Sequence, residues 1–234
     1  MSGHADSLHG MHIAQRSVPQ YKLFVSVPLQ RSHRLISLAY GLFNVIYGVL
    51  FIVCDQHPSR NDEKAHWLRA MQIMSGHPRS VADPGSASRF GGIGQDGVFT
   101  DFSNTAVYSP LVYFPSLFSG GDYRTACIFT LLFCTVITSV AILLCGGMGP
   151  LMAVSAMLPT VFLSYSFPSA DSITTAIAFL FIRAVFYCRA NPSPGALPML
   201  TFIPLPLGRT TFTYPAILLL LPLVIKRNSP FKSW

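Results

Sequence analysis

Long runs of residues without a formal charge constrain this chain more than any other feature of its sequence. Arg34 and Asp55 enclose 20 uncharged residues, and Arg124 and Asp171 enclose 46. A helix rises about 1.5 Å per residue, so 20 residues reach about 30 Å, the thickness of the hydrocarbon core of a bilayer. The first run therefore predicts a membrane-spanning helix at 35–54.

The second uncharged run is too long for one span and contains a cluster that breaks helices. This cluster is Gly-Gly-Met-Gly-Pro at 146–150, which permits a tight turn. We expect two antiparallel spans on either side of it, at about 125–145 and 150–167. Another span is expected from Asp171 to about Cys188.

Two further apolar segments follow Arg189. The segment 190–209 is broken by five prolines, whereas 210–225 is continuously apolar and ends at Lys226. With both included, the sequence predicts an all-α fold: a polytopic transmembrane helix bundle of five or six spans. Six spans are expected if the proline-rich segment crosses the membrane.

Composition agrees with a membrane protein. Hydrophobic residues make up 51% of the chain and charged residues only 11%, against roughly 25% charged in soluble domains. A mean hydropathy of +0.47 excludes a disordered chain, a coiled coil and most cytosolic enzymes. The net charge of +7 does not indicate nucleic-acid binding, because the basic residues flank apolar runs instead of gathering on one face.

Charge also predicts the orientation of the chain. The residues before the first span include Arg16, Lys22, Arg31 and Arg34 but no acid after Asp6, so the positive-inside rule places the N-terminus in the cytoplasm. The predicted organisation is a cytoplasmic tail at 1–34, a first transmembrane helix at 35–54, an extracytoplasmic loop at 55–123 with an interfacial helix at 61–75, a transmembrane bundle at 124–226 and a cytoplasmic tail at 227–234.

Seven of the nine acidic residues lie in the loop, including the only glutamate, Glu63. Asn61 is a suitable N-cap for the predicted helix, acids in its first turn match the helix dipole, and Gly76 is expected to end it. Its apolar residues at helical spacing suit a position on the membrane surface. They are Trp67, Leu68, Met71 and Met74.

The same helix carries the strongest candidate for chemistry. Asp62 and His66 are one turn apart on one face, with Glu63 beside them. An Asp-Glu-x-x-His group can hold a divalent cation, or can pair a general base with a residue that orients it. Capping of the helix and a surface ion pair explain the same residues without chemistry.

Three other features of the sequence have both a structural and a functional interpretation. Tyr108 and Tyr113 either form an aromatic belt at the membrane surface or stack on a sugar or lipid headgroup. Asp171 either caps its helix or lies over the same site as Asp62. Arg183, inside a span, either extends to the cytoplasmic face or binds phosphate. The glycine-rich stretch at 89–97 is typical of a flexible loop.

The order of these motifs resembles a known family. A span is followed directly by Asp-Glu-x-x-His-Trp-x-Arg-Ala (62–70), then by Tyr-x-Pro-Leu-x-Tyr-x-Pro (108–115), an arginine at the start of a span, and Pro-Ser-x-Asp (168–171). Over about 40–225 the chain resembles a bacterial family of uncharacterised multipass membrane proteins. Those are similar to the GT-C superfamily of glycosyltransferases, which includes the protein O-mannosyltransferases.

The resemblance implies an enzyme of the plasma (inner) membrane that uses a polyprenyl-phosphate sugar donor on the outer face. It assigns catalysis to Asp62 and Glu63, and substrate contacts to His66, Arg69, Tyr108, Tyr113 and Asp171. It also implies a possible divalent metal, which Asp62, Glu63 and His66 would hold.

The chain departs from the family in three respects. Lys64 replaces the usual proline, 190–209 is irregular, and the chain is short. These departures indicate a truncated member, a diverged member or a fragment of a longer protein.

Two alternatives to a glycosyltransferase follow from the sequence. One is a non-catalytic membrane subunit or remnant of such an enzyme, which would bind a membrane protein partner. The other is a transporter, although transporters usually show internal symmetry and several charges inside the membrane. Here only Arg183 is such a charge.

The predicted topology can be tested by cysteine accessibility in a background without the native cysteines. Single cysteines at positions 62 and 171 should react with an impermeant thiol reagent added from outside the cell, because both are predicted on the outer face. Labelling at position 205 tests whether 190–209 crosses. Reaction of position 62 or 171 only from the cytoplasmic side would contradict the proposed site.

Overall fold

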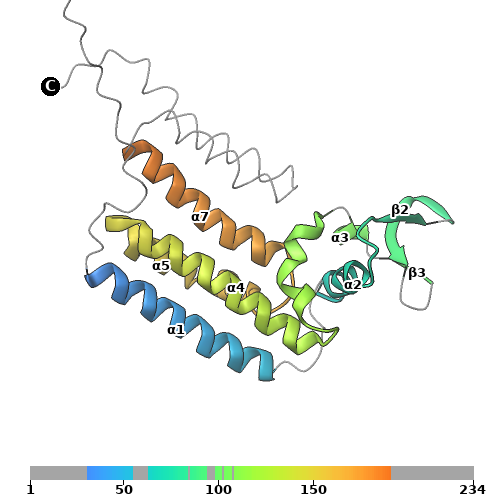
Figure 1. Cartoon of the computed structure of the whole chain (residues 1–234), viewed down its shortest axis with the longest axis horizontal. Coiled ribbons are helices and arrows are strands. Elements are labelled where there is room, and N and C mark those ends of the chain that lie inside the picture. Colours follow the sequence, from blue (N-terminus) through green and yellow to red (C-terminus); the bar gives the residue numbers. More distant parts are fainter. Residues whose placement is uncertain are drawn as a thin grey trace, which may run out of the picture.

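The computed structural model describes residues 31–54, 63–83, 85–93, 98–101, 103–106 and 108–190 (Figure 1). Several predicted features lie outside the described residues. They are Asp62, most of the predicted N-terminal tail, the segments 191–209 and 210–225, and the C-terminal tail. The helices are α1 (Arg31–Cys54), α2 (Glu63–Met74), α3 (Ser103–Ala106), the 3-10 helix η1 (Pro110–Phe118), α4 (Tyr123–Leu144), the 3-10 turn η2 (Gly146–Met148), α5 (Gly149–Ala156), α6 (Pro159–Ser164) and α7 (Ala170–Ala190).

Three of these helices are long and apolar enough to span a membrane. They are α1, α4 and the part of α7 from Ala170 to Tyr187. Each coincides with a span predicted from the sequence, at 35–54, at 125–145 and from Asp171 to Cys188. The mostly helical fold and its association with a membrane are thus supported, while the total of five or six spans stays a prediction.

The predicted span at 150–167 is wrong as a single helix. Residues 149–164 form α5, with eight residues, and α6, with six. At about 1.5 Å per residue neither approaches the roughly 30 Å of a bilayer core. The break falls at Met157 and Leu158, immediately before Pro159, which starts α6. Proline lacks the backbone N–H that a continuous helix needs at that position.

The two short helices nevertheless return the chain along the bundle, because α4 and α7 run parallel. Leu131, in the first half of α4, belongs to the same buried cluster as Ile173, near the start of α7. Ile142, near the end of α4, belongs to a second cluster with Phe179, further along α7. The chain between Leu144 and Ala170 must therefore pass from one end of the bundle to the other. It does so through α5 and α6, which pack against α1 (Figure 1).

Helices α1 and α4 are antiparallel and packed closely through small and polar residues. The Ser37 hydroxyl donates to the carbonyl of Ser139 at 2.8 Å, and Asn44 Nδ2 donates to Thr135 Oγ1 at 2.5 Å. Gly48 lies directly against the Leu131 side chain. Small residues let two backbones approach, and polar side chains join helices across an apolar medium.

The outer faces of these helices are apolar, the reverse of a soluble protein. On α1 the large apolar side chains that are exposed are Leu35, Leu38, Leu42, Ile46, Tyr47, Leu50 and Val53. On α4 they are Ile128, Phe129, Leu132, Val136 and Val140. The exposed arginines Arg31, Arg34 and Arg124 lie only at the first turns of these helices. Helices surrounded by lipid are expected to have large apolar side chains on the surface of the bundle and small or polar residues where the helices contact one another.

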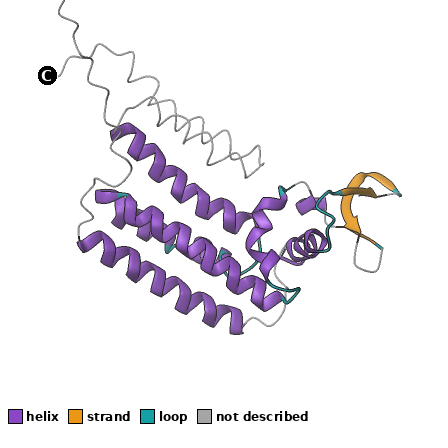
Figure 2. Cartoon of the chain, viewed as in Figure 1, coloured by secondary structure: helices purple, strands orange, loops and turns teal. Residues whose placement is uncertain are grey.

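The loop after α1 departs from the all-α prediction, because it contains a small antiparallel sheet at one end of the molecule (Figure 2). Its strands, in the order β1-β2-β3, are β1 (Val81–Asp83), β2 (Ser86–Ile93) and β3 (Phe99–Asp101). The flexible loop expected at 89–97 is thus partly strand. Gly91 and Gly92 leave no room for a Cβ, since the Thr100 carbonyl and the Gln72 side chain occupy that space. These glycines serve close packing.

The contact between α1 and α4 predicts the effect of a larger residue at Gly48. Gly48→Val should destabilise the protein by about 1–3 kcal/mol, because an added side chain meets the fully buried Leu131. Thermal unfolding in detergent measures the change. Gly147→Val is the control, since nothing lies within 4 Å of a Cβ there. Equal melting temperatures for the two variants would contradict the close packing.

Candidate functional site

The candidate site lies at the end of the bundle where α1 ends and α4 and α7 begin. Here α2 packs against η1, α3 and β2 (Figure 1). The predicted helix at 61–75 is confirmed over Glu63–Met74. It ends at Met74, and the expected glycine follows in the turn: Gly76 has a φ of 88°, a left-handed conformation that glycine adopts without strain.

Helix α2 turns its polar side toward the protein. Its fully buried residues are Glu63, His66, Arg69, Ala70 and Gln72. The apolar residues Trp67, Leu68, Met71 and Met74 are only partly buried. This orientation is possible because the surface that α2 faces offers hydroxyl and carbonyl partners, so each buried polar residue of α2 makes at least one hydrogen bond.

Glu63 meets the first residue of a spanning helix. The Tyr123 hydroxyl donates a hydrogen bond to Glu63 Oε1, and Glu63 is only 4% exposed. The ring of Trp67 packs edge-on against Tyr123, with 5.4 Å between ring centroids. A predicted site residue is thereby joined to the end of α4.

Asp122 fixes the end of α4 that carries Tyr123. As N-cap of α4, its carboxylate accepts the Thr125 backbone N–H at 2.7 Å. Hydrogen bonds from the Thr125 side chain and backbone lower the pKa of the Asp122 carboxyl. The cap is therefore complete above the ordinary aspartate pKa and is lost only when the pH falls through that lowered value.

His66 is enclosed by the two tyrosines that the sequence analysis singled out. Its Nδ1 lies 2.7 Å from the Tyr113 hydroxyl, and the Tyr108 ring stacks on the imidazole at 5.6 Å with 13° between the planes. His66 is 0% and Tyr113 1% exposed. Thr105, from α3, closes the same region by donating to the Ala65 carbonyl at 3.2 Å.

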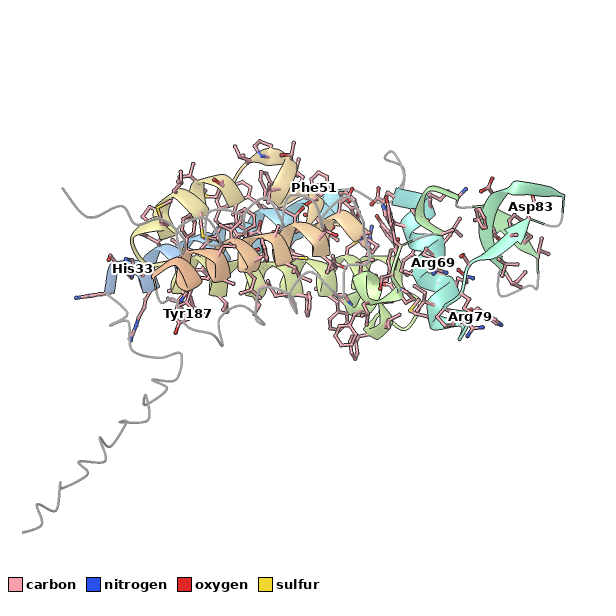
Figure 3. All side chains as sticks on the ribbon, turned by 90° about the horizontal axis from the view of Figure 1, so that it is seen from above. His33, Phe51, Arg69, Arg79, Asp83 and Tyr187 are labelled. Carbon is pink, nitrogen blue, oxygen red and sulfur yellow. The ribbon has the colours of Figure 1, made fainter. Side chains whose placement is uncertain are left out.

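Arg69 holds the chain that leaves α2. Its guanidinium donates to Gln72 Oε1 and, at 2.7 Å, to the Pro78 carbonyl, while Gln72 Nε2 donates to the Arg79 carbonyl at 2.9 Å. Burial lowers the pKa of the Arg69 guanidinium. Figure 3 shows Arg69 on α2 and Arg79 beyond the end of that helix. The contacts of Arg69 thus connect α2 to the segment that leads into the sheet.

Asp171 lies in the first turn of α7, with its side chain exposed. Because η1 contacts α7, Asp171 is at the same end of the bundle as α2, as the sequence predicted. Its substrate-binding role stays a prediction. Arg183 lies in the later part of α7, toward the opposite end of the bundle, the end at which Figure 3 labels Tyr187 and His33. It is 7% exposed and packs over the Tyr187 ring, 4.9 Å from the ring centroid.

The described residues do not themselves form a metal site. Among them no group of three or more His, Cys, Asp or Glu side chains converges. Glu63 and His66 each bond a tyrosine instead. Asp62, the third predicted ligand, lies outside the described residues, so the metal stays a prediction.

An apolar pocket of about 480 Å³ lies at the other end of α2. The sequence alone does not indicate this pocket, because its two walls come from segments about 40 residues apart. Its lining residues are Met71, Ile73, Met74, Ser75, Leu117, Gly120 and Gly121. The pocket is separate from the cluster of Glu63 and His66.

Comparison with protein-family models, with curated proteins and with solved structures finds no match for this chain.

The arrangement of His66 predicts the effect of removing its tyrosine partner. Tyr113→Phe should destabilise the protein by about 1–3 kcal/mol, because a buried ring nitrogen loses its hydrogen bond. Thermal unfolding in detergent measures the loss. Tyr47→Phe, on an exposed part of α1, is the matched control. An unchanged melting temperature for Tyr113→Phe would show that the contact does not stabilise the fold.

Proposed function

We propose that the protein is an integral membrane glycosyltransferase, or a relative of one, that takes its sugar from a polyprenyl-phosphate donor. In this proposal Glu63, together with Asp62, acts as the base that activates an acceptor hydroxyl. His66, Arg69, Tyr108, Tyr113 and Asp171 shape the substrate site. The donor class comes from the ordered motifs of the sequence.

One observation carries the proposal: Glu63 is positioned by Tyr123, the first residue of a spanning helix. The phosphate of a lipid-linked donor lies at the membrane surface, so the group that acts beside it must lie there too. A carboxylate held at the end of α4 meets this requirement. A hydrogen bond from the Tyr123 hydroxyl also fixes the orientation of the carboxylate.

The proposed orientation places this end of the bundle outside the plasma membrane. Arg31 and Arg34 lie at the opposite end, at the start of α1, while Glu63 and Asp171 lie at the end that holds α2. Basic residues favour the cytoplasmic side. The N-terminus is therefore proposed to be cytoplasmic.

Burial of the cluster favours a second candidate, a non-catalytic membrane subunit. Glu63, His66 and Tyr113 are each less than 5% exposed, which suits a cluster that holds α2 on the bundle. In this proposal the polar contacts stabilise a surface for a membrane protein partner, and no sugar is transferred.

Sugar transfer by wild type and variants tests the first proposal. Membrane fractions are incubated with a panel of radiolabelled polyprenyl-phosphate sugars, and transferred label is counted. Glu63→Gln and Asp62→Asn should each lower transfer on the order of 100-fold or more, because a general base is lost while the side-chain shape is kept. Lys64→Gln, on an exposed neighbour, should transfer normally.

The two candidates give different results in the same preparations. Normal transfer by both carboxylate variants would reject the proposed catalytic role. For a non-catalytic subunit, the wild type transfers none of the sugars, and Glu63→Gln instead lowers the melting temperature or the yield of a co-purified membrane partner.

A further inference from the structure

Helix η1 buries one side and leaves an apolar side uncovered. Its buried residues are Val112, Tyr113, Pro115 and Ser116. Its exposed residues recur about every third position, as the three-residue turn of a 3-10 helix requires. They are Leu111 (57% exposed), Phe114 (44%), Leu117 (36%) and Phe118 (60%).

No charged residue interrupts this face, since η1 reads PLVYFPSLF. An exposed surface made only of large hydrocarbon side chains marks contact with a membrane or with another protein. The exposed residues are leucine and phenylalanine. Tyr113, for which an aromatic belt was one of two interpretations from the sequence, points inward to His66. The apolar face and the site thus lie on opposite sides of one short helix.

Ring contacts connect this face to the outer surface of α4. Phe114 packs against Phe133, and Phe118 against Phe129, each pair with 6.2 Å between ring centroids. Phe129 is exposed on the same apolar surface of α4 as Val136. Since that surface belongs to a helix long and apolar enough to span a membrane, lipid chains around α4 also meet the exposed face of η1.

The contacts with α4 also give the depth of this face. Phe129 is six and Phe133 ten residues after Tyr123, so at about 1.5 Å per residue they lie about 9 and 15 Å from the start of the helix. Both depths fall within one half of a bilayer core of about 30 Å. Gly120 and Gly121, with φ of 62° and 88°, turn the chain from η1 back into α4.

We propose that η1 is a membrane-anchoring segment that inserts Leu111, Phe114, Leu117 and Phe118 into the acyl chains of a single leaflet. Its partner is the lipid of that leaflet, and insertion needs no substrate or reaction. Because the opposite side of η1 carries Tyr113 to His66, the anchor holds α2 and its polar cluster at the level of the lipid headgroups.

Depth-dependent fluorescence quenching tests the anchor. Single tryptophans replace Leu111 or Phe118 in purified full-length protein whose Trp67 and Trp234 are changed to phenylalanine. The protein is reconstituted in phospholipid vesicles, with lipids brominated either near the headgroup end or near the methyl end of the acyl chain. Val136→Trp, exposed on α4, is the lipid-facing control, and Val81→Trp, exposed on β1, is the control outside the bundle.

Leu111→Trp and Phe118→Trp should be quenched several-fold more strongly than Val81→Trp, and the ratio of quenching by the two bromine positions gives the depth of each side chain in the leaflet. Circular dichroism checks each fold, and the two sites test the same face independently if one variant misfolds. Quenching of both at the level of Val81→Trp, with quenching by aqueous iodide, would overturn the proposal and leave the face to a protein partner. The result does not depend on sugar transfer.

Discussion

The close contact of α1 with α4 is the interaction on which the rest of the structure depends. Lipid offers no hydrophobic gain when two apolar helices meet, so association needs backbone approach and polar contacts. Gly48 against Leu131 provides the approach, and the bond from Asn44 to Thr135 joins the helices across a buried interface. With α1 and α4 antiparallel, the 68 residues between them must begin and end at the same end of the bundle.

That constraint explains why the polar cluster lies where it does. The end of α1 and the start of α4 bring α2 and Tyr123 together, so Glu63 meets a hydroxyl from a spanning helix. Helix η1 contacts both α2 and α4. Its Tyr113 bonds His66 of α2, and its Phe114 packs against Phe133 of α4. The same short helix therefore connects the proposed site to the proposed lipid contact.

Much of the bundle was predictable because spanning helices are set by local composition. Two of the three spans follow from uncharged runs of the required length, and the third follows from an apolar segment after Asp171 that only Arg183 interrupts. The end of α2 near Gly76 follows from that glycine. The prediction of one spanning helix at 150–167 was wrong, because the helix is interrupted just before Pro159 although the segment is apolar in composition. The prediction for 89–97 was incomplete, because Gly91 and Gly92 look flexible until the strand and side chain packed against them are known.

By itself the sequence determined the three long apolar helices α1, α4 and α7 and the acids of the loop, since charge and hydropathy act residue by residue. It did not determine which side of α2 is buried. The polar side of that helix turns inward only because Tyr123, Tyr113 and Pro78, up to 60 residues away, supply partners for Glu63, His66 and Arg69. Only the tertiary structure decides this, because a buried polar group is stable only where partners from distant segments converge on it.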